Sequence, residues 1–525
     1  MIDELAQTYA HYVALRRELS LWVEQSIRRD GPDKNQGGED EANFALAFFP
    51  HYLVSGDERI AVRFRSLAND LKAWVRAECL HGYEPEAEAH HGTEPFLLFL
   101  PRYLGLFPDD REAAALLDDA AHHIGNWVEG VPAWYDWTRD VFLSYWIGTR
   151  TVGGAHGDRE LAEHFRFLHI ALAAWRVTGE AHYRDWALRY GRKRAERLLA
   201  ADERMPVLWD LDGRGLQPED LQTRAERAMA ANNHHITGDP LAGSENLLAS
   251  GAIYALGDLF LLEGDDIFRR AAKRIVEPLI GELLDPYADP AAAALSYYRR
   301  TFADSSLDDA MCAVLARQPA EPEAPWAMVF PQERQRREPG VGKRSDMIYW
   351  GHWAEDGSVQ PSREPSTAAL ALGYQLTGEW TMARRALGAA AAKFAMARRV
   401  LRGGREHADM GGAICSVAAG HGRNWGCGAV TDCYGPLLMG TREIQGAVVP
   451  LVEWAAGHLP EQILALVQPP VSGPGAVLFY NGSEEQQVLG WRMAGATDWQ
   501  RIELAPGEVQ EYPLEEDSCA YTPTC

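Results

Sequence analysis

The feature that most restricts the fold of this chain is a repeated pattern of two helices joined by a short turn of glycine and an acidic residue. The pattern is found in FFPHYLVSGDERIAVRF, ALAAWRVTGEAHYRDWAL, LGDLFLLEGDDIFRRAA and LGYQLTGEWTMARRALGA, around Gly56, Gly179, Gly264 and Gly378. A degenerate copy, LPRYLGLFPDDREAAALL, carries Pro108 instead of the glycine. Glycine takes the left-handed conformation that ends the first helix. The acidic side chain then suits the first turn of the second helix, where it meets the positive end of the helix dipole.

A helical hairpin of this kind cannot cover its own apolar face. Apolar residues at spacings of three and four give each helix a buried side, so neighbouring hairpins must stack on one another. An open stack needs polar capping repeats at its ends, and the sequence shows none. We therefore expect a mainly α fold, an (α/α) toroid of six or seven hairpins that spans residues 1–465.

The C-terminal part of the chain follows a different pattern. From about Gln468, apolar and polar residues alternate in AVLFYNGSEEQQVLGWRMAGATDWQRIELAPGEVQEYPL, with Asn-Gly and Pro-Gly turns between the runs. This alternation predicts four short strands. We expect a small antiparallel β unit over residues 466–515, followed by an acidic tail over 516–525.

The charge and the apolar content restrict the classes of partner and the location. A formal charge of −24, from 51 basic and 75 acidic residues, opposes binding to nucleic acids and to anionic membranes. There is no apolar run long enough to span a membrane and no N-terminal signal pattern. We expect a cytoplasmic protein, or a secreted or periplasmic one if a signal has been removed.

Aromatic residues and histidines gather in the longer connections between the hairpins. The chain has 17 Trp and 19 Tyr, whose rings can bind the C–H faces of sugars. Loops on a rigid scaffold often carry function, so we expect these segments to form one aromatic cleft. The predicted substrate-binding residues are His90, His91, Trp134, Trp137, Trp209, Arg299, Arg300, Tyr349, Trp350, His352, Arg405 and Trp425.

The segment Asn232-Asn233-His234-His235 resembles the Asn-Asn-His motif of polysaccharide lyases with an (α/α) toroid fold, such as alginate lyases and heparinase-like enzymes. The resemblance implies β-elimination in glycans that contain uronic acid. It implies that Asn233 neutralises the uronate carboxylate and that His234 acts as a base. His235 departs from the family, which often has a small residue there, and no motif fixes the position of the family's tyrosine.

Elimination removes the C5 proton beside the carboxylate and expels the 4-O-linked sugar. The enolate-like state needs positive or hydrogen-bonding groups, and His or Tyr can serve as base and acid. Tyr-Tyr-Arg-Arg at 297–300 offers an acid or base and a carboxylate clamp. The predicted catalytic residues are Asn233, His234, Tyr297, Tyr298 and His407, and we expect no metal or cofactor.

Two other functions fit the same fold. A glycoside hydrolase needs two carboxylates beside the scissile bond, and the candidates are Asp136, Asp210, Asp212, Glu355 and Asp356. A helical-repeat protein that only binds a partner needs no such group. The motifs also have purely structural interpretations, because Asn-Asn-His-His could cap a helix and Tyr-Tyr-Arg-Arg could be a solvated helix face.

Overall fold

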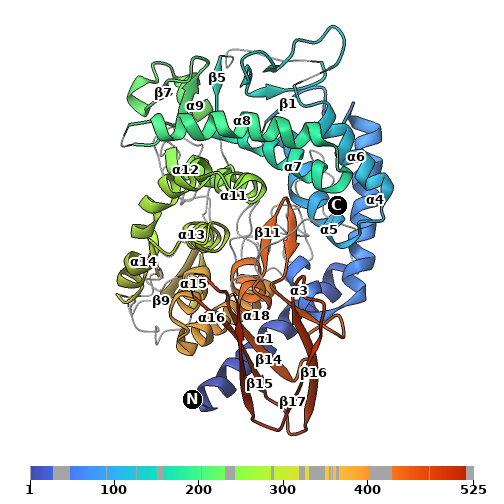
Figure 1. Ribbon diagram of the computed structural model, residues 1–525, viewed down its shortest axis with the longest axis vertical. Coiled ribbons are helices and arrows are strands. Elements are labelled where there is room, and N and C mark those ends of the chain that lie inside the picture. The colour runs from blue at the N-terminus through green and yellow to red at the C-terminus, as the bar shows by residue number, and fades with distance from the viewer. Residues whose placement is uncertain are drawn as a thin grey trace.

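Figure 1 shows the computed structural model of the chain, a ring of helices with strands at its centre and at one end. The structure describes residues 2–27, 46, 48–89, 91–125, 127–150, 158–202, 204–230, 243–284, 289–317, 326–329, 349–353, 356, 359–361, 366–400, 429–471 and 473–515. Within this part of the chain, no helix is both long enough and apolar enough to cross a membrane.

Each predicted repeat forms a helical hairpin. The pairs are α3 (Phe48–Ser55) with α4 (Glu58–Glu78), α5 (Leu100–Leu106) with α6 (Arg111–His122), α7 (Arg166–Thr178) with α8 (Ala181–Ala200), α11 (Ala252–Glu263) with α12 (Asp266–Val276), and α15 (Thr367–Thr377) with α16 (Trp380–Val400). Gly179, Gly264 and Gly378 end their helices in the left-handed conformation, as predicted. Glu58 and Asp266 lie in the first turn of their helices, as predicted. Asp265 lies one position before α12 and caps it by accepting a hydrogen bond from the Ile267 amide.

Another hairpin escapes the sequence pattern. Helices α13 (Asp289–Thr301) and α14 (Asp308–Leu315) follow one another; α13 packs between α11 and α15, and α14 packs on α15. Their turn uses Ala303 at φ +46° instead of a glycine. A left-handed alanine is uncommon, so nothing in the sequence indicated a helix-ending turn at this position.

The first and last long helices meet and close the ring. Helix α1 (Ile2–Ile27) lies along α16, and Arg398 of α16 donates to Glu18 of α1 at 2.6 Å. The Trp22 ring of α1 lies between Phe48 and Phe394, at 4.6 and 5.5 Å between ring centroids. The mainly helical toroid expected from the repeats is therefore confirmed (Figure 1).

Two antiparallel sheets form the C-terminal β unit. All four predicted strands are present: β15 (Gly475–Asn481), β16 (Gln487–Met493), β17 (Gln500–Leu504) and β18 (Val509–Leu514). Two earlier strands, β13 (Val452–Trp454) and β14 (Ile463–Gln468), extend them into sheets of order β13-β16-β17 and β14-β15-β18. Phe479 joins the two sheets, with its ring 5.4 Å from that of Trp491.

Strand β14 begins before residue 466, where the β unit was expected to start. Its continuous apolar sequence does not show the alternation of apolar and polar residues by which the other strands were predicted. Its residues Ile463 to Val467 are all buried, because α18 (Gly435–Met439) covers it as well as the sheet interior. A run buried on both faces does not alternate. The division of the chain at residue 465 stays a prediction, and the expected tail over 516–525 lies outside the described residues.

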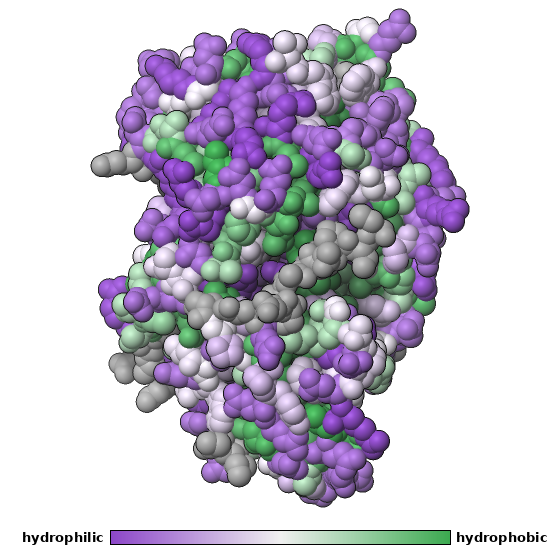
Figure 2. Space-filling model, in the orientation of Figure 1, coloured by the Kyte–Doolittle hydropathy of each residue, from purple (hydrophilic) through white to green (hydrophobic). Residues whose placement is uncertain are grey.

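Ten short strands lie in the described connections between the helices. They are β1 (Ala87–Glu88), β2 (Tyr135–Asp136), β3 (Val141–Phe142), β4 (Trp146–Ile147), β5 (Arg159–Glu160), β6 (Leu208–Asp210), β7 (Gly215–Leu216), β8 (Trp326–Val329), β9 (Tyr349–Trp353) and β10 (Val359–Pro361). On the face shown in Figure 2, hydrophobic residues gather toward the middle of the molecule and hydrophilic residues dominate its rim. The middle of the ring is where the site described next lies.

Candidate functional site

A β-hairpin enters the centre of the ring and is fixed there by its tip. Strands β11 (Arg442–Ile444) and β12 (Ala447–Val449) pair around Gln445 and Gly446 (Figure 1). The Gln445 amide donates to the Asp258 carboxylate of α11 at 2.9 Å. The Gln445 carbonyl accepts from Arg176 of α7 at 3.2 Å. Gly446 has φ +75°, and a Cβ there would lie 2.5 Å from the Pro101 Cβ, so only glycine fits.

Asp258 is the buried titratable group at this anchor. It is 2% exposed, and burial raises the pKa of its carboxyl to about 8, partly offset by the hydrogen bond from Gln445. Taking a carboxylate out of water disfavours its charged form. Near neutral pH the protonated form of Asp258 is therefore favoured.

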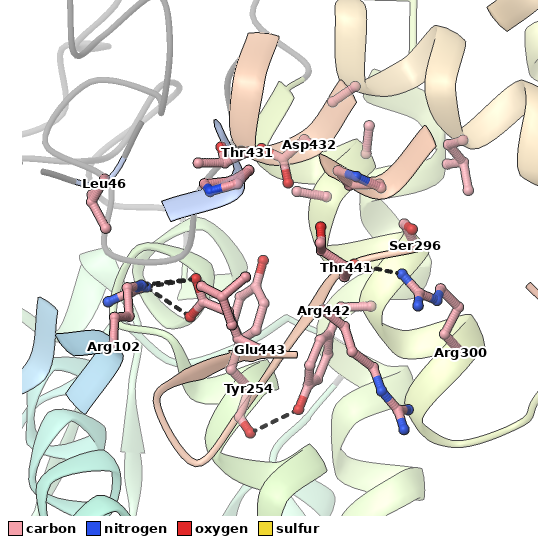
Figure 3. Close-up of a pocket in the computed structure, with 18 residues that line it drawn as sticks. Leu46, Arg102, Tyr254, Ser296, Arg300, Thr431, Asp432, Thr441, Arg442 and Glu443 are labelled. Carbon is pink, nitrogen blue, oxygen red and sulfur yellow. Dashed lines mark hydrogen bonds and ion pairs between the residues drawn. The ribbon is translucent and has the colours of Figure 1, made fainter. Parts of the chain in front are cut away.

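Beside this hairpin lies a pocket that is open in part to solvent. It is bounded by α5, α11, α13, β11 and the π-helix η7 (Ala429–Tyr434). Its polar and charged lining residues, most of them labelled in Figure 3, are Arg102, Tyr254, Ser296, Tyr297, Arg300, Thr431, Asp432, Thr441, Arg442 and Glu443. Three guanidinium groups and two carboxylates thus line one pocket, a local excess of positive charge in a chain of net charge −24.

Arg102 and Glu443 form a bidentate ion pair in the wall of the pocket. The Arg102 Nη2 donates to both carboxylate oxygens at 2.7 Å, and its Nε donates to Oε1 at 3.1 Å (Figure 3). The Arg102 side chain is 1% exposed and that of Glu443 is 16% exposed. Planar bidentate pairs fix direction as well as distance, so this pair sets the position of β11 against α5.

Arg300 reaches the opposite side of the hairpin from α13. Its Nη1 donates to the Thr441 carbonyl at 2.8 Å, and its Nη2 donates to the Gly440 carbonyl at 2.6 Å. These bonds hold the guanidinium beside the pocket that Arg442 also lines. Two cationic side chains from different elements therefore lie on this side of the pocket.

Two tyrosines form the floor between α11 and α13. The Tyr297 hydroxyl donates to the Tyr254 carbonyl at 3.2 Å, and the two rings lie 4.4 Å apart. Burial, with the nearby Asp258 carboxyl, raises the pKa of Tyr297 well above its usual value. A phenol in this state keeps its proton, which it directs at the Tyr254 carbonyl oxygen.

The helix separates the four predicted residues of the Tyr-Tyr-Arg-Arg segment. Tyr297 and Arg300 line the pocket, but Tyr298 and Arg299 face elsewhere. The Tyr298 hydroxyl donates to Asp304, and the Arg299 Nε donates to Asp308 at 2.8 Å. Successive residues of an α-helix point about 100° apart, while residues three apart share a face. The segment therefore contributes two residues to the pocket and two to the packing around α14.

The predicted tryptophans lie outside the central pocket as the described residues define it. Trp134 is buried with its ring 5.1 Å from Phe167. Trp209 is fully buried, with the Arg194 guanidinium 4.9 Å from its ring. Trp137 is 41% exposed, in a surface cluster with Trp127. Trp134 and Trp209 thus pack in the interior, and Trp137 lies at the surface.

Several predicted residues cannot be placed from their side chains. His90, Asn233, His234, Arg405, His407 and Trp425 lie outside the described residues. For His91 in η1 (His91–Thr93) and for Tyr349, Trp350 and His352 in β9, the structure describes the backbone alone. Their roles as site residues stay predictions.

The carboxylates named for hydrolysis lie away from the pocket where they are described. Asp136 accepts from Arg139 at 2.7 Å on the surface. Asp210 accepts from the amides of Asp212 and Arg214 and thereby stabilises a turn. Asp356 is exposed, and Glu355 lies outside the described residues. The carboxylates that do line the pocket are Asp432 and Glu443. Neither lies in a motif recognised in the sequence.

One sequence signal could have pointed to the pocket. Arg102 is the one charged residue in the apolar run FLLFLPRYLGLF, and a cation in such a helix needs a partner. Its partner lies 341 positions away in sequence. Arg442 and Glu443 lie in TREIQG, a short charged strand before a Gln-Gly turn that sequence analysis did not recognise.

Comparison with known proteins gives distant structural likenesses. No protein-family model and no curated protein sequence matches the chain. One similar solved structure is described as a substituted form of a protein abbreviated UGL with the saccharide dGlcA-Glc-Rha-Glc; it is 14% identical, covers 60% of this chain and 86% of its own, and has a TM-score of 0.39. Another is the unsaturated glucuronyl hydrolase of Bacillus sp. GL1, described as responsible for the degradation of glycosaminoglycan; it is 14% identical, covers 62% of this chain and 86% of its own, and has a TM-score of 0.36. Likeness at this level establishes neither activity nor substrate.

Proposed function

We propose that this protein is an enzyme that cleaves a glycosidic bond of a uronate-containing oligosaccharide in the central pocket. The observation that carries the proposal is the convergence of Arg102, Arg300, Asp432, Arg442 and Glu443 on one pocket beside the β11–β12 hairpin.

The arginines are the basis for a uronate in the substrate. A guanidinium matches a carboxylate with two parallel hydrogen bonds. Arg300 and Arg442 come from different elements and line the same side of the pocket. The surrounding chain is strongly acidic, so these arginines form a local site of opposite sign where a sugar carboxylate would be held.

Hydrolysis fits the described pocket residues best. It requires an acid that protonates the leaving oxygen and a second carboxylate that activates water or attacks the sugar. Asp432 and Glu443 both line the pocket. We assign the acid role to Asp432, which is half-buried on η7. Glu443, oriented by its ion pair with Arg102, takes the second role.

β-Elimination is the second candidate, and the placement of Tyr297 and Arg300 in the pocket favours it. Arg300 would neutralise the carboxylate, and the protonated Tyr297 would donate to the leaving oxygen. The base would then be His234, with Asn233 beside the carboxylate, as the lyase resemblance implies. This proposal requires two residues that the structure does not describe.

A single assay separates the two reactions. The protein is incubated with a panel of uronate-containing oligosaccharides, and two signals are followed: new reducing ends and the ultraviolet absorbance of a C=C bond conjugated to the uronate carboxylate. Hydrolysis gives reducing ends without absorbance, and Asp432→Asn abolishes it. Elimination gives both signals, and Asn233→Ala and His234→Ala abolish them.

The control is Glu219→Gln, which removes an exposed carboxylate paired with Arg204 on the surface. It should leave either activity unchanged. Neither signal on any glycan would reject an enzyme of this class and favour the third reading, a helical-repeat binding protein.

A further inference from the structure

A cluster of histidines lies on the turn that follows α4 and at the end of α6. His81 is in this turn, and Asp119 and His123 lie in the last turn and at the C-terminal cap of α6. The rings of His81 and His123 stack with centroids 3.5 Å apart and planes 7° apart. The Nδ1 atom of each ring is 3.1 Å from the same oxygen, Oδ1 of Asp119.

The turn that carries His81 is docked firmly on α6. The backbones of Leu80 and Tyr83 exchange two hydrogen bonds, at 2.9 and 3.0 Å. The Tyr83 hydroxyl donates to the Ala120 carbonyl of α6 at 2.9 Å. At Gly82, with φ +82°, a Cβ would lie 2.9 Å from that of Ala120. The histidine is therefore held against α6 by contacts that do not involve its own ring.

His81 itself adopts an unusual backbone conformation. Its φ is +54°, in the left-handed region that residues with a Cβ rarely occupy. Such strain persists where the surrounding structure fixes it, and it often accompanies function. Glycine would adopt this conformation without strain, so the presence of histidine calls for a role for its side chain.

We propose that His81, Asp119 and His123 bind one divalent transition-metal ion of the zinc class. Imidazole nitrogens and a carboxylate oxygen are ligands that zinc prefers, and ligand atoms around a tetrahedral zinc lie about 3.4 Å apart. The three ligand atoms lie within 4.8 Å of one another. A metal–nitrogen bond lies in the plane of its imidazole, so the stacked rings must turn out of their parallel arrangement to direct both Nδ1 atoms at one ion. The bonds to the ion then replace the 3.1 Å contacts with Asp119. The side chains of His81, Asp119 and His123 are 36%, 43% and 17% exposed, so an ion and a water ligand can reach them.

A hydrogen bond competes with the ion. The Nδ1 atom of His123 lies 2.7 Å from the Asp119 carbonyl oxygen, to which it donates when it carries the proton. The ion takes the place of this proton, so binding releases it. Once bound, the ion joins the turn after α4 to α6, and it stabilises the folded chain because the unfolded chain does not hold the three ligands together.

The test uses the full chain without a histidine tag, treated with a chelator and then titrated with Zn²⁺. Calorimetry measures stoichiometry and affinity, and the melting temperature is measured with and without the ion. Visible absorbance of added Co²⁺ reports coordination by nitrogen and oxygen. We expect one Zn²⁺ per chain and a rise in melting temperature.

His81→Gly is the decisive variant, because glycine fits the backbone conformation and keeps the turn folded. It should melt without Zn²⁺ at least as high as the parent chain, yet bind Zn²⁺ at least about tenfold more weakly. Asp119→Asn should weaken binding in the same way. The control His458→Ala removes a partly exposed histidine that lies between β13 and β14 and should bind as the parent does. Absence of saturable binding in the parent, or parent-like binding in both His81→Gly and Asp119→Asn, would overturn the proposal.

Discussion

The amide of Gln445 donates a hydrogen bond to the buried carboxylate of Asp258 at 2.9 Å, and this contact fixes the tip of the central hairpin to the helical ring. The hairpin in turn supplies Arg442 and Glu443 to the pocket. The stability of the anchor and the shape of the site are therefore coupled.

Asp258→Asn should make stability less dependent on pH. The pKa of the Asp258 carboxyl is about 8 in the folded chain and has an ordinary value of 3.8. Between these values the folded state keeps a proton that the unfolded state loses, so the stabilising contribution, full below about pH 4, is lost as the pH rises to about 8. Asparagine accepts the same amide hydrogen bond without titrating. Denaturant unfolding should be measured at several pH values. The unfolding free energy of the variant should rise relative to that of the parent as the pH rises, by up to a few kcal/mol at pH 8. A difference that is constant with pH would contradict the assignment.

Gly446→Ala should displace the hairpin. The residue has φ +75°, and a Cβ would lie 2.5 Å from that of Pro101. Gly457 has the same φ, and the space around it is open. Gly457→Ala therefore measures the backbone strain alone, about 1–2 kcal/mol, and Gly446→Ala should lose about 1–3 kcal/mol more through the clash. Equal losses of unfolding free energy in both variants would show that the hairpin tip can move away from α5.

Removing one member of the Arg102–Glu443 pair should be costlier than removing both. Arg102→Met leaves the Glu443 carboxylate largely buried without this partner, which should reduce the unfolding free energy by about 3–5 kcal/mol. Arg102→Met combined with Glu443→Leu should recover part of the loss. A double-mutant cycle measures the coupling, and additive effects would mean that the two side chains stabilise the fold independently.

Adjacent arginines should give opposite phenotypes. Arg300 lines the pocket, whereas the buried Arg299 pairs with Asp308. Arg300→Ala should raise KM for a uronate oligosaccharide about tenfold or more, corresponding to about 1.4 kcal/mol. Its effect should be smaller on the same sugar with the carboxylate reduced to an alcohol. Arg299→Ala should lower the melting temperature and leave KM unchanged; a KM change in Arg299→Ala alone would reverse the assignment.

The helical hairpins and the four C-terminal strands were predictable because their signals are local. Gly179, Gly264 and Gly378 end helices through a property of their own backbone, and the apolar spacing beside them defines the buried faces. The α13–α14 turn was missed because Ala303 adopts a left-handed conformation that is not expected of alanine. Strand β14 was missed because burial on both faces removed the alternation.

Local patterns were therefore enough to predict a mainly helical repeat with a β appendage, and to place Tyr297 and Arg300 among the candidates. That these two line the pocket while Tyr298 and Arg299 do not became clear only from the folded chain. Packing of the folded chain also brings Arg102 to Glu443 across 341 positions, and a short hairpin into the ring. Local patterns specify conformation within a few residues, but the partner of a buried charge depends on how distant elements pack. The composition of the pocket is set at that longer range.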